Sequence, residues 1–104
     1  MKKKIKTIVY CSTTADMFHY GHLRLLEKAN VLGDFFICGV LTDEAIKSYK
    51  EEPIASLKER MAIVSALRCV GKVVTQRSLD PTENLKEIHS QFRDAKIILV
   101  CGSN

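Results

Sequence analysis

The stretch IKTIVYCSTTADMFHYGHLRLLEKANVLGDFFICGVLT, residues 5–42, decides the fold. It opens with a β-branched apolar run at 5–13, which predicts a strand. It closes with a continuous apolar run at 34–42, as expected of a strand buried on both faces. Between them, residues 22–33 have helical spacing, and Gly33 supplies a natural helix stop. The apolar positions of this helix are Leu23, Leu26, Ala29 and Leu32. The stretch therefore predicts a strand, a helix and a parallel strand.

The rest of the chain continues this alternation. Helices are expected over 43–50, 56–71 and 80–94, and strands over 72–76 and 95–104. The expected helix caps are Thr42, Ser56 with Glu59, and Asp80 with Pro81 and Glu83. Alternating strands and helices predict one α/β domain over residues 1–104, a Rossmann-like doubly wound parallel sheet with helices on both faces. Ligands of such sheets bind at the carboxyl ends of the strands.

Charge and composition narrow the class of protein. The 104 residues carry a net charge of +4, which suits an anionic ligand but lacks the dense basic surface of a nucleic-acid-binding protein. The start, MKKKIK, resembles a signal peptide, but the apolar run after it is too short. No stretch approaches the roughly 20 apolar residues that span a bilayer. We expect a cytoplasmic protein with no membrane span and no nucleic-acid partner.

The four cysteines are widely spaced and form no C-x-x-C pair, which argues against a zinc site or a disulfide framework. Three of them, Cys11, Cys38 and Cys101, fall in expected strands, where a thiol behaves as a small buried hydrophobe. The prediction is that the cysteines are core thiols in a reducing compartment.

HYGH, residues 19–22, places two of the three histidines between the first strand and the first long helix. A helix start binds anions through its N–H groups and dipole, and Gly21 removes a side chain where a phosphate would approach. His19 and His22 can stabilise charge on a phosphoryl group during transfer. A cap or surface role is the alternative. No metal site is expected, because no further ligand cluster accompanies the pair.

H-x-G-H after a first strand is the signature of the nucleotidyltransferase superfamily, and the chain resembles its cytidylyltransferases. TTADMFHYGHLRLLEKANVLGD, GVLTDEAIKSYK, ERMAIVSALRCVGKVV and QRSLDPTENLK resemble, in order, enzymes acting on glycerol-3-phosphate, phosphocholine and phosphoethanolamine. ADMFHYGH, LTDEAIKSYK and SLDPTENL look closest to the branch that activates phosphonates such as 2-aminoethylphosphonate. The resemblance implies CMP transfer from CTP to a phosphorylated or phosphonate small molecule, with Mg²⁺-bound pyrophosphate leaving.

The resemblance also implies roles for individual residues. Catalytic contacts to the nucleotide are implied for His19, His22 and Lys50. Nucleotide binding is implied for Thr13, Thr14, Asp16, Gly21, Lys47, Arg60 and Gly102. Asp16 has a turn or cap role as its alternative, and His89 is interpreted as a surface residue. Arg60 lies near a helix N-terminus, where a cation is disfavoured by about 0.3–1 kcal/mol, so a further partner is expected to hold it.

The last residues depart from the family pattern. Gly102, Ser103 and Asn104 stand where these enzymes typically have G-D-D, and a later segment that closes over the nucleotide, R-T-x-G-I-S-T-S or similar, is missing. The chain is either a fragment of a longer transferase or a short protein that binds nucleotide without efficient turnover, borrowing a missing element across a homodimer. An adenylyltransferase of the same superfamily and a non-catalytic nucleotide-binding module are the alternative functions.

Overall fold

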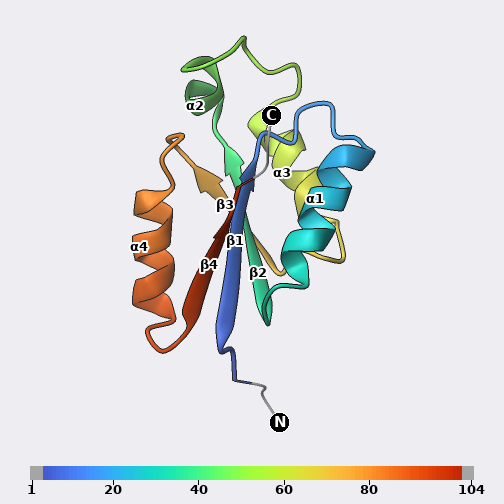
Figure 1. The fold of residues 1–104 in the computed structure, drawn as a ribbon. Helices are drawn as coiled ribbons and strands as arrows, with labels where there is room; N and C mark the ends of the chain where they lie inside the picture. Colours follow the sequence, from blue (N-terminus) through green and yellow to red (C-terminus); the bar gives the residue numbers. More distant parts are fainter. Residues whose placement is uncertain (1–3, 102–104) are drawn as a thin grey trace.

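The computed structural model describes residues 4–101 and contains a parallel sheet with strand order β3-β2-β1-β4 (Figure 1). The strands are β1 (Thr7–Thr13), β2 (Phe35–Leu41), β3 (Lys72–Gln76) and β4 (Lys96–Val100). The helices are α1 (Tyr20–Asn30), α2 (Asp43–Lys47), α3 (Leu57–Ser65) and α4 (Thr82–Gln91). None of the helices in this part of the chain has the length and apolarity needed to cross a bilayer.

The helices cover both faces of the sheet. On one face, α1 and α3 pack around Val9, Cys11 and Cys38. On the other face, α4 packs Ile88 against Ile8 and further residues of the central strands. Figure 1 shows α4 separated by the sheet from α1 and α3. This confirms the predicted doubly wound α/β fold, in which the apolar runs of β1 and β2 form the centre.

The caps of the short middle helices are as predicted. Thr42 accepts a hydrogen bond from the Ala45 N–H, and Ser56 forms a reciprocal capping box with Glu59. The predicted start of the last helix is wrong. It begins at Thr82, and Asp80 accepts a hydrogen bond from the Thr82 N–H at 2.9 Å without capping a longer helix. A local side-chain turn therefore competes with the cap there.

The limits of α1 also differ from the prediction. The helix starts at Tyr20 because His19 caps it, and it ends at Asn30 rather than at Gly33. Beyond this end the chain turns toward β2, and Leu32, the last of the four apolar positions at helical spacing, is 52% exposed. Gly33 instead allows close packing on β1, since a Cβ there would lie 2.8 Å from Cγ2 of Val9.

The cysteines divide into buried and accessible thiols, and all four are free. Cys11 and Cys38 are paired in register on β1 and β2, and burial raises the pKa of Cys11 to about 11. The prediction that Cys101 lies in a strand is wrong, because β4 ends at Val100 and Cys101 is exposed. Of the four cysteines predicted as core thiols, Cys11 and Cys38 are therefore buried in the core, whereas Cys69 and Cys101 are not.

Candidate functional site

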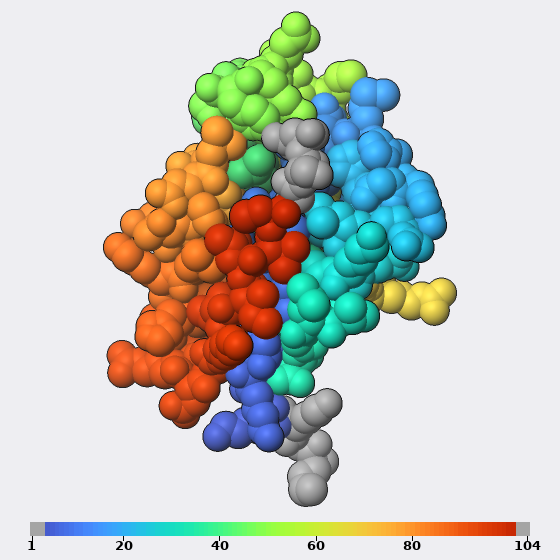
Figure 2. Space-filling view, viewed as in Figure 1, coloured from blue at the N-terminus to red at the C-terminus, as the bar shows by residue number. Residues whose placement is uncertain are grey.

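A cavity of about 630 Å³ lies at the carboxyl ends of the strands. Six predicted site residues line it, namely Thr13, Thr14, His19, Gly21, His22 and Lys50. In Figure 2 the blue β1–α1 segment and the green segment around α2 stand at the same end of the molecule. The sheet topology therefore gathers residues from separate connections into one hollow, as is usual for ligand sites in doubly wound folds.

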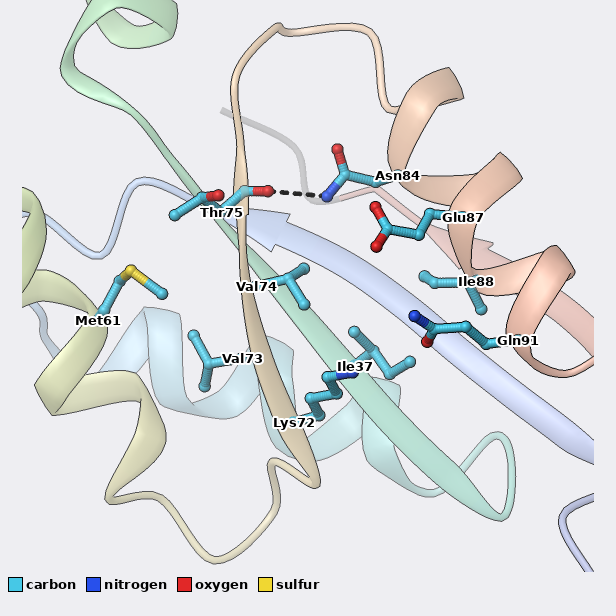
Figure 3. A pocket seen from close by; sticks show the side chains of 10 residues that line it. All are labelled: Ile37, Met61, Lys72, Val73, Val74, Thr75, Asn84, Glu87, Ile88 and Gln91. Atoms are coloured by element: carbon cyan, nitrogen blue, oxygen red, sulfur yellow. Dashed lines mark hydrogen bonds between the residues drawn. The ribbon is translucent and has the colours of Figure 1, made fainter.

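Another cavity, of about 380 Å³, lies between β3 and α4 (Figure 3). Lys72, Asn84 and Glu87 supply polar groups to it, while Val74 and Ile88 supply apolar ones. It contains none of the predicted site residues. The cavity with the histidines is therefore the candidate functional site.

The two histidines cap the helix on which they stand. His19 is the N-cap of α1, and its Nδ1 accepts a hydrogen bond from the Gly21 N–H at 2.9 Å. His22 Nδ1 accepts one in return from the His19 N–H at 3.1 Å. The rings lie 4.2 Å apart between centroids. The cap role proposed as an alternative is therefore present, and both roles are compatible because each imidazole has a second nitrogen.

These hydrogen bonds fix the tautomer of each ring. A neutral imidazole whose Nδ1 accepts a hydrogen bond carries its proton on Nε2, which is then a donor. Within residues 4–101, neither Nε2 atom of His19 or His22 makes a hydrogen bond. Burial, assisted by the charges of His19 and Lys50, lowers the pKa of His22 and so favours its neutral form. The pair thus presents two N–H donors beside the cavity.

Gly21 also has a structural role that was not predicted. A Cβ on Gly21 would lie 2.7 Å from Cε1 of His19, so any larger residue would displace the capping imidazole. The glycine also lines the cavity, where it was expected to admit a phosphate. The spacing H-x-G-H is therefore explained locally. The first ring folds back over the helix start, and the glycine leaves it room.

The two candidate lysines are placed differently. Lys50 lines the cavity, with its Nζ 5.7 Å from the centroid of the Tyr49 ring. Its charge contributes to lowering the pKa of both Asp16 and His22. Lys47 lies outside the cavity and forms a largely exposed ion pair with Glu52 at 3.4 Å. Of the predicted pair, only Lys50 is brought together with the histidines.

Asp16 holds the turn that carries the histidines. Its carboxylate accepts hydrogen bonds from the N–H groups of Ile54 and Ala55, at 3.0 and 2.9 Å. These bonds, led by the one from Ala55, lower the pKa of Asp16. The neighbouring Ala15 and Met17 have positive φ angles of 55° and 50°, a region that costs a non-glycine residue about 1–2 kcal/mol. The geometry supports the turn role for Asp16, which does not line the cavity.

Arg60 is completely buried beneath the site. Its guanidinium donates to the carbonyls of Ala55, Thr14 and Leu41, at 3.1, 2.8 and 2.6 Å. It also pairs with the Asp43 carboxylate at 2.6 Å, which supplies the partner expected at this helix start. Arg60 thus joins three separate segments of the chain and does not line the cavity, and its contact with a nucleotide stays a prediction.

Six cavity residues were not predicted as site residues from the sequence, namely Ser12, Leu25, Leu41, Tyr49, Leu79 and Cys101. Tyr49 follows α2, Leu79 lies between β3 and α4, and Cys101 follows β4. The rule that ligands bind at strand ends could have indicated Leu79 and Cys101, whereas no motif marks them. The predicted residue Gly102 lies outside the described residues.

The described residues offer no metal centre of their own. Over residues 4–101, no group of three or more histidine, cysteine or acidic side chains lies close enough together to hold an ion. The cavity is lined by hydroxyls and imidazoles and, in this part of the chain, by no carboxylate. A Mg²⁺ ion prefers carboxylate and phosphate oxygens, so any Mg²⁺ here would depend on a bound phosphate ligand.

Comparison with known proteins agrees with this arrangement. The chain matches the family described as Cytidylyltransferase-like over residues 10–104. It is 34% identical over 99 residues to ethanolamine-phosphate cytidylyltransferase of Arabidopsis thaliana, covering 94% of this chain and 24% of that protein. It is 32% identical over 93 residues to glycerol-3-phosphate cytidylyltransferase of Bacillus spizizenii, covering 89% of this chain and 69% of that protein.

A solved structure shares the fold. The lipopolysaccharide core biosynthesis protein from Thermoplasma volcanium matches with a TM-score of 0.73 at 19% identity, covering 96% of this chain and 99% of that one. The chain spans about a quarter of the length of the plant relative. The family match covers the histidine turn, the cavity and almost all of the sheet, and on that basis the chain belongs to the Cytidylyltransferase-like family.

Proposed function

We propose that the cavity binds CTP with Mg²⁺ and that the chain transfers CMP to a small phosphorylated or phosphonate acceptor, releasing pyrophosphate. The observation that carries this proposal is the pair of imidazoles at the start of α1, whose Nδ1 atoms accept the cap hydrogen bonds and whose Nε2 atoms make no hydrogen bond within the described residues. The names of the Arabidopsis and Bacillus relatives support CTP as the nucleotide and a small phosphate ester as acceptor.

The reaction needs positioning and charge stabilisation more than covalent chemistry. An oxygen of the acceptor attacks the α-phosphorus of CTP, a new phosphorus–oxygen bond forms, and the bond to the β-phosphate breaks. Negative charge grows on the α-phosphate oxygens and on the leaving pyrophosphate. The Nε2–H groups of His19 and His22 and the ammonium of Lys50 would stabilise it. Because the cap bonds already orient the rings, no reorganisation is required as the charge develops.

Mg²⁺ enters this proposal with the substrate. The cavity residues do not form a magnesium site, so the triphosphate oxygens would hold the ion. The hydroxyls of Ser12, Thr13 and Thr14 line the cavity and would bind phosphate oxygens or the water around Mg²⁺. A homodimer, a cytoplasmic location and the absence of a nucleic-acid partner stay predictions.

Calorimetric titration with Mg²⁺ and CTP, and with Mg²⁺ and ATP, tests the nucleotide. Preference for CTP is expected, whereas preference for ATP would favour an adenylyltransferase. Pyrophosphate release is then measured with phosphoethanolamine, glycerol-3-phosphate and 2-aminoethylphosphonate. CTP binding without release with any acceptor would favour a non-catalytic binding module.

Histidine variants test the site. His19→Ala and His22→Ala should lower turnover about 100-fold and weaken CTP binding less than about tenfold, because their contacts strengthen in the transition state. His89→Ala is the matched control, since His89 is an exposed histidine on α4. Equal behaviour of all three variants would remove the histidine pair from the site.

A further inference from the structure

A hydrogen bond crosses the sheet below the cavity and joins strands that are not neighbours. The Tyr10 hydroxyl on β1 donates to Oε1 of Gln76 on β3 at 2.5 Å, and both side chains are buried. The intervening strand, β2, carries Gly39 at this point. A Cβ on Gly39 would collide with the Tyr10 hydroxyl and approach Gln76 Oε1 to 3.2 Å. The glycine therefore provides the space in which the pair meets.

The other end of the Gln76 amide holds a loop. Nε2 donates to the carbonyl of Ser78 at 2.8 Å and lies 3.4 Å from the carbonyl of Leu79. These carbonyls and the Tyr10 hydroxyl fix the amide orientation, since carbonyls accept only from the NH₂ group. Burial raises the pKa of Tyr10, so its hydroxyl remains a donor. Residues 78–80, the β3–α4 loop, are thus anchored from the core.

The loop has a separate tether at its far end. Asn84 of α4 donates to the carbonyl of Thr75 at 2.9 Å, which ties the start of the helix to β3 (Figure 3). This bond fixes the start of α4 relative to β3, but it does not hold the 78–80 loop that lies between them. The position of Leu79 therefore depends on Gln76.

Leu79 is the residue of this loop that reaches the candidate functional site. It lines the cavity and is 47% exposed. The imidazoles and Lys50 supply polar groups for phosphates, whereas an apolar side chain is suited to the carbon skeleton of a ligand. A buried amide is costly unless it is fully bonded, so an apolar residue at position 76 would serve a purely structural core better.

We infer that Gln76 is a positioning residue that, set by Tyr10 and Gly39, holds the 78–80 loop so that Leu79 forms the wall against the nucleoside part of the nucleotide. This inference rests on the proposed function of the same cavity. It assigns to a buried pair on β1 and β3 a role that no sequence motif marks.

The test compares CTP with inorganic tripolyphosphate, which has the phosphates and no nucleoside. Gln76→Met and Leu79→Ala should each raise the Kd for CTP about tenfold and leave the Kd for tripolyphosphate within about twofold. Tyr10→Phe should act in the same direction with a smaller effect. Gln91→Met is the matched control, because Gln91 is exposed on α4 and lies outside the site. An unchanged CTP affinity, or an equal loss for both ligands, would overturn the inference.

Amide hydrogen exchange separates this inference from the proposed function. The Asp80 N–H is bonded to Ser78 Oγ within the loop at 3.2 Å. In Gln76→Met its exchange should accelerate about tenfold while the amides of α1 keep their protection. Should the unaltered chain bind neither CTP nor tripolyphosphate, the proposed function fails and Leu79 loses its role. Hydrogen exchange then still decides whether Gln76 holds the loop. Equal exchange rates of the Asp80 amide in Gln76→Met and Gln91→Met would show that Gln76 does not hold it.

Discussion

The histidine turn and Arg60 lie at the same end of the sheet and use basic side chains in opposite ways. His19 and His22 bond to main-chain groups within three residues, and each keeps one ring nitrogen free within the described residues. Arg60 bonds to groups as far as 46 residues away and is completely buried. A group that is held by one nitrogen and free at the other is available to a ligand, whereas Arg60 is committed to the scaffold.

Removing the Arg60 guanidinium tests this contrast most strongly. Arg60→Met leaves three carbonyls without their donor and Asp43 without its ion-pair partner. The free energy of unfolding should fall by about 3 kcal/mol, the lower end for a broken buried pair because Asp43 is partly exposed. Urea denaturation measures the loss. The control is Arg68→Met, which changes an exposed arginine. Equal stability of the two variants would mean that Arg60 is not a scaffold residue.

A substitution at Gly21 should have the opposite effect, with a loss of CTP affinity and little change in the free energy of unfolding. Gly21→Ala displaces the His19 ring, because the new Cβ would lie 2.7 Å from Cε1. The affinity for CTP should fall about tenfold. Stability should change by less than about 1 kcal/mol, because the gain in helix propensity offsets the weakened cap. Calorimetry and urea denaturation measure the two effects, and a large loss of stability with unchanged affinity would reverse the assignment.

Thiol labelling distinguishes the cavity from the core. Cys101 lines the cavity and is exposed, whereas Cys11 and Cys38 are buried and burial raises the pKa of both thiols. A maleimide should modify Cys101 first, and saturating CTP should slow that reaction about fivefold. Cys69, partly exposed outside the cavity, is the internal control. Mass spectrometry of the peptides follows each site, and equal slowing at Cys69 would contradict protection by a bound nucleotide.

The smallest expected effect is that of protonating His22, which should make the stability of the histidine turn depend on pH. The folded protein lowers the pKa of His22 below its ordinary 6.5, chiefly through burial, so the neutral ring is favoured. Its contribution to stability is fully present above pH 6.5 and is lost as the pH falls through the lowered pKa. Protonation of Nδ1 also removes the acceptor for the His19 N–H. The amide resonance of His19 should therefore shift on acidification below pH 6.5.

The part of that shift that follows the titration of His22 should be absent in His22→Ala, because the variant lacks both the ring and the hydrogen bond from the His19 N–H. A midpoint above 6.5 in the unaltered chain would contradict the depressed pKa. Such a result would indicate that the turn stabilises the charged imidazole and that the two histidines do not serve as neutral donors.

The sequence was informative where structure depends on near neighbours. The apolar runs of β1 and β2, the capping box at Ser56 and the histidine turn all arise from residues within a few positions of each other. These features could be predicted together with the sheet they imply. The start of α4 was mistaken because two local hydrogen-bond patterns, a helix cap and an Asp80 turn, fit the same residues.

The rest of the site depends on contacts that span long stretches of chain. The partners of Arg60 come from the loop after β1, from the end of β2 and the start of α2, and from the segment before α3. Tyr10 and Gln76 are 66 residues apart. The sequence identifies an arginine that matches a family motif, but it does not show whether the guanidinium is free or already engaged in hydrogen bonds. Only the packed structure distinguishes these two states.

The strand order has a consequence for synthesis on the ribosome. β1 leaves the exit tunnel first, yet one of its two hydrogen-bonding edges pairs with β4, residues 96–100. Until that segment emerges, this largely buried strand has an open edge that can pair with other chains. A nascent chain of this protein therefore passes through an aggregation-prone stage that lasts until residues 96–100 have left the exit tunnel.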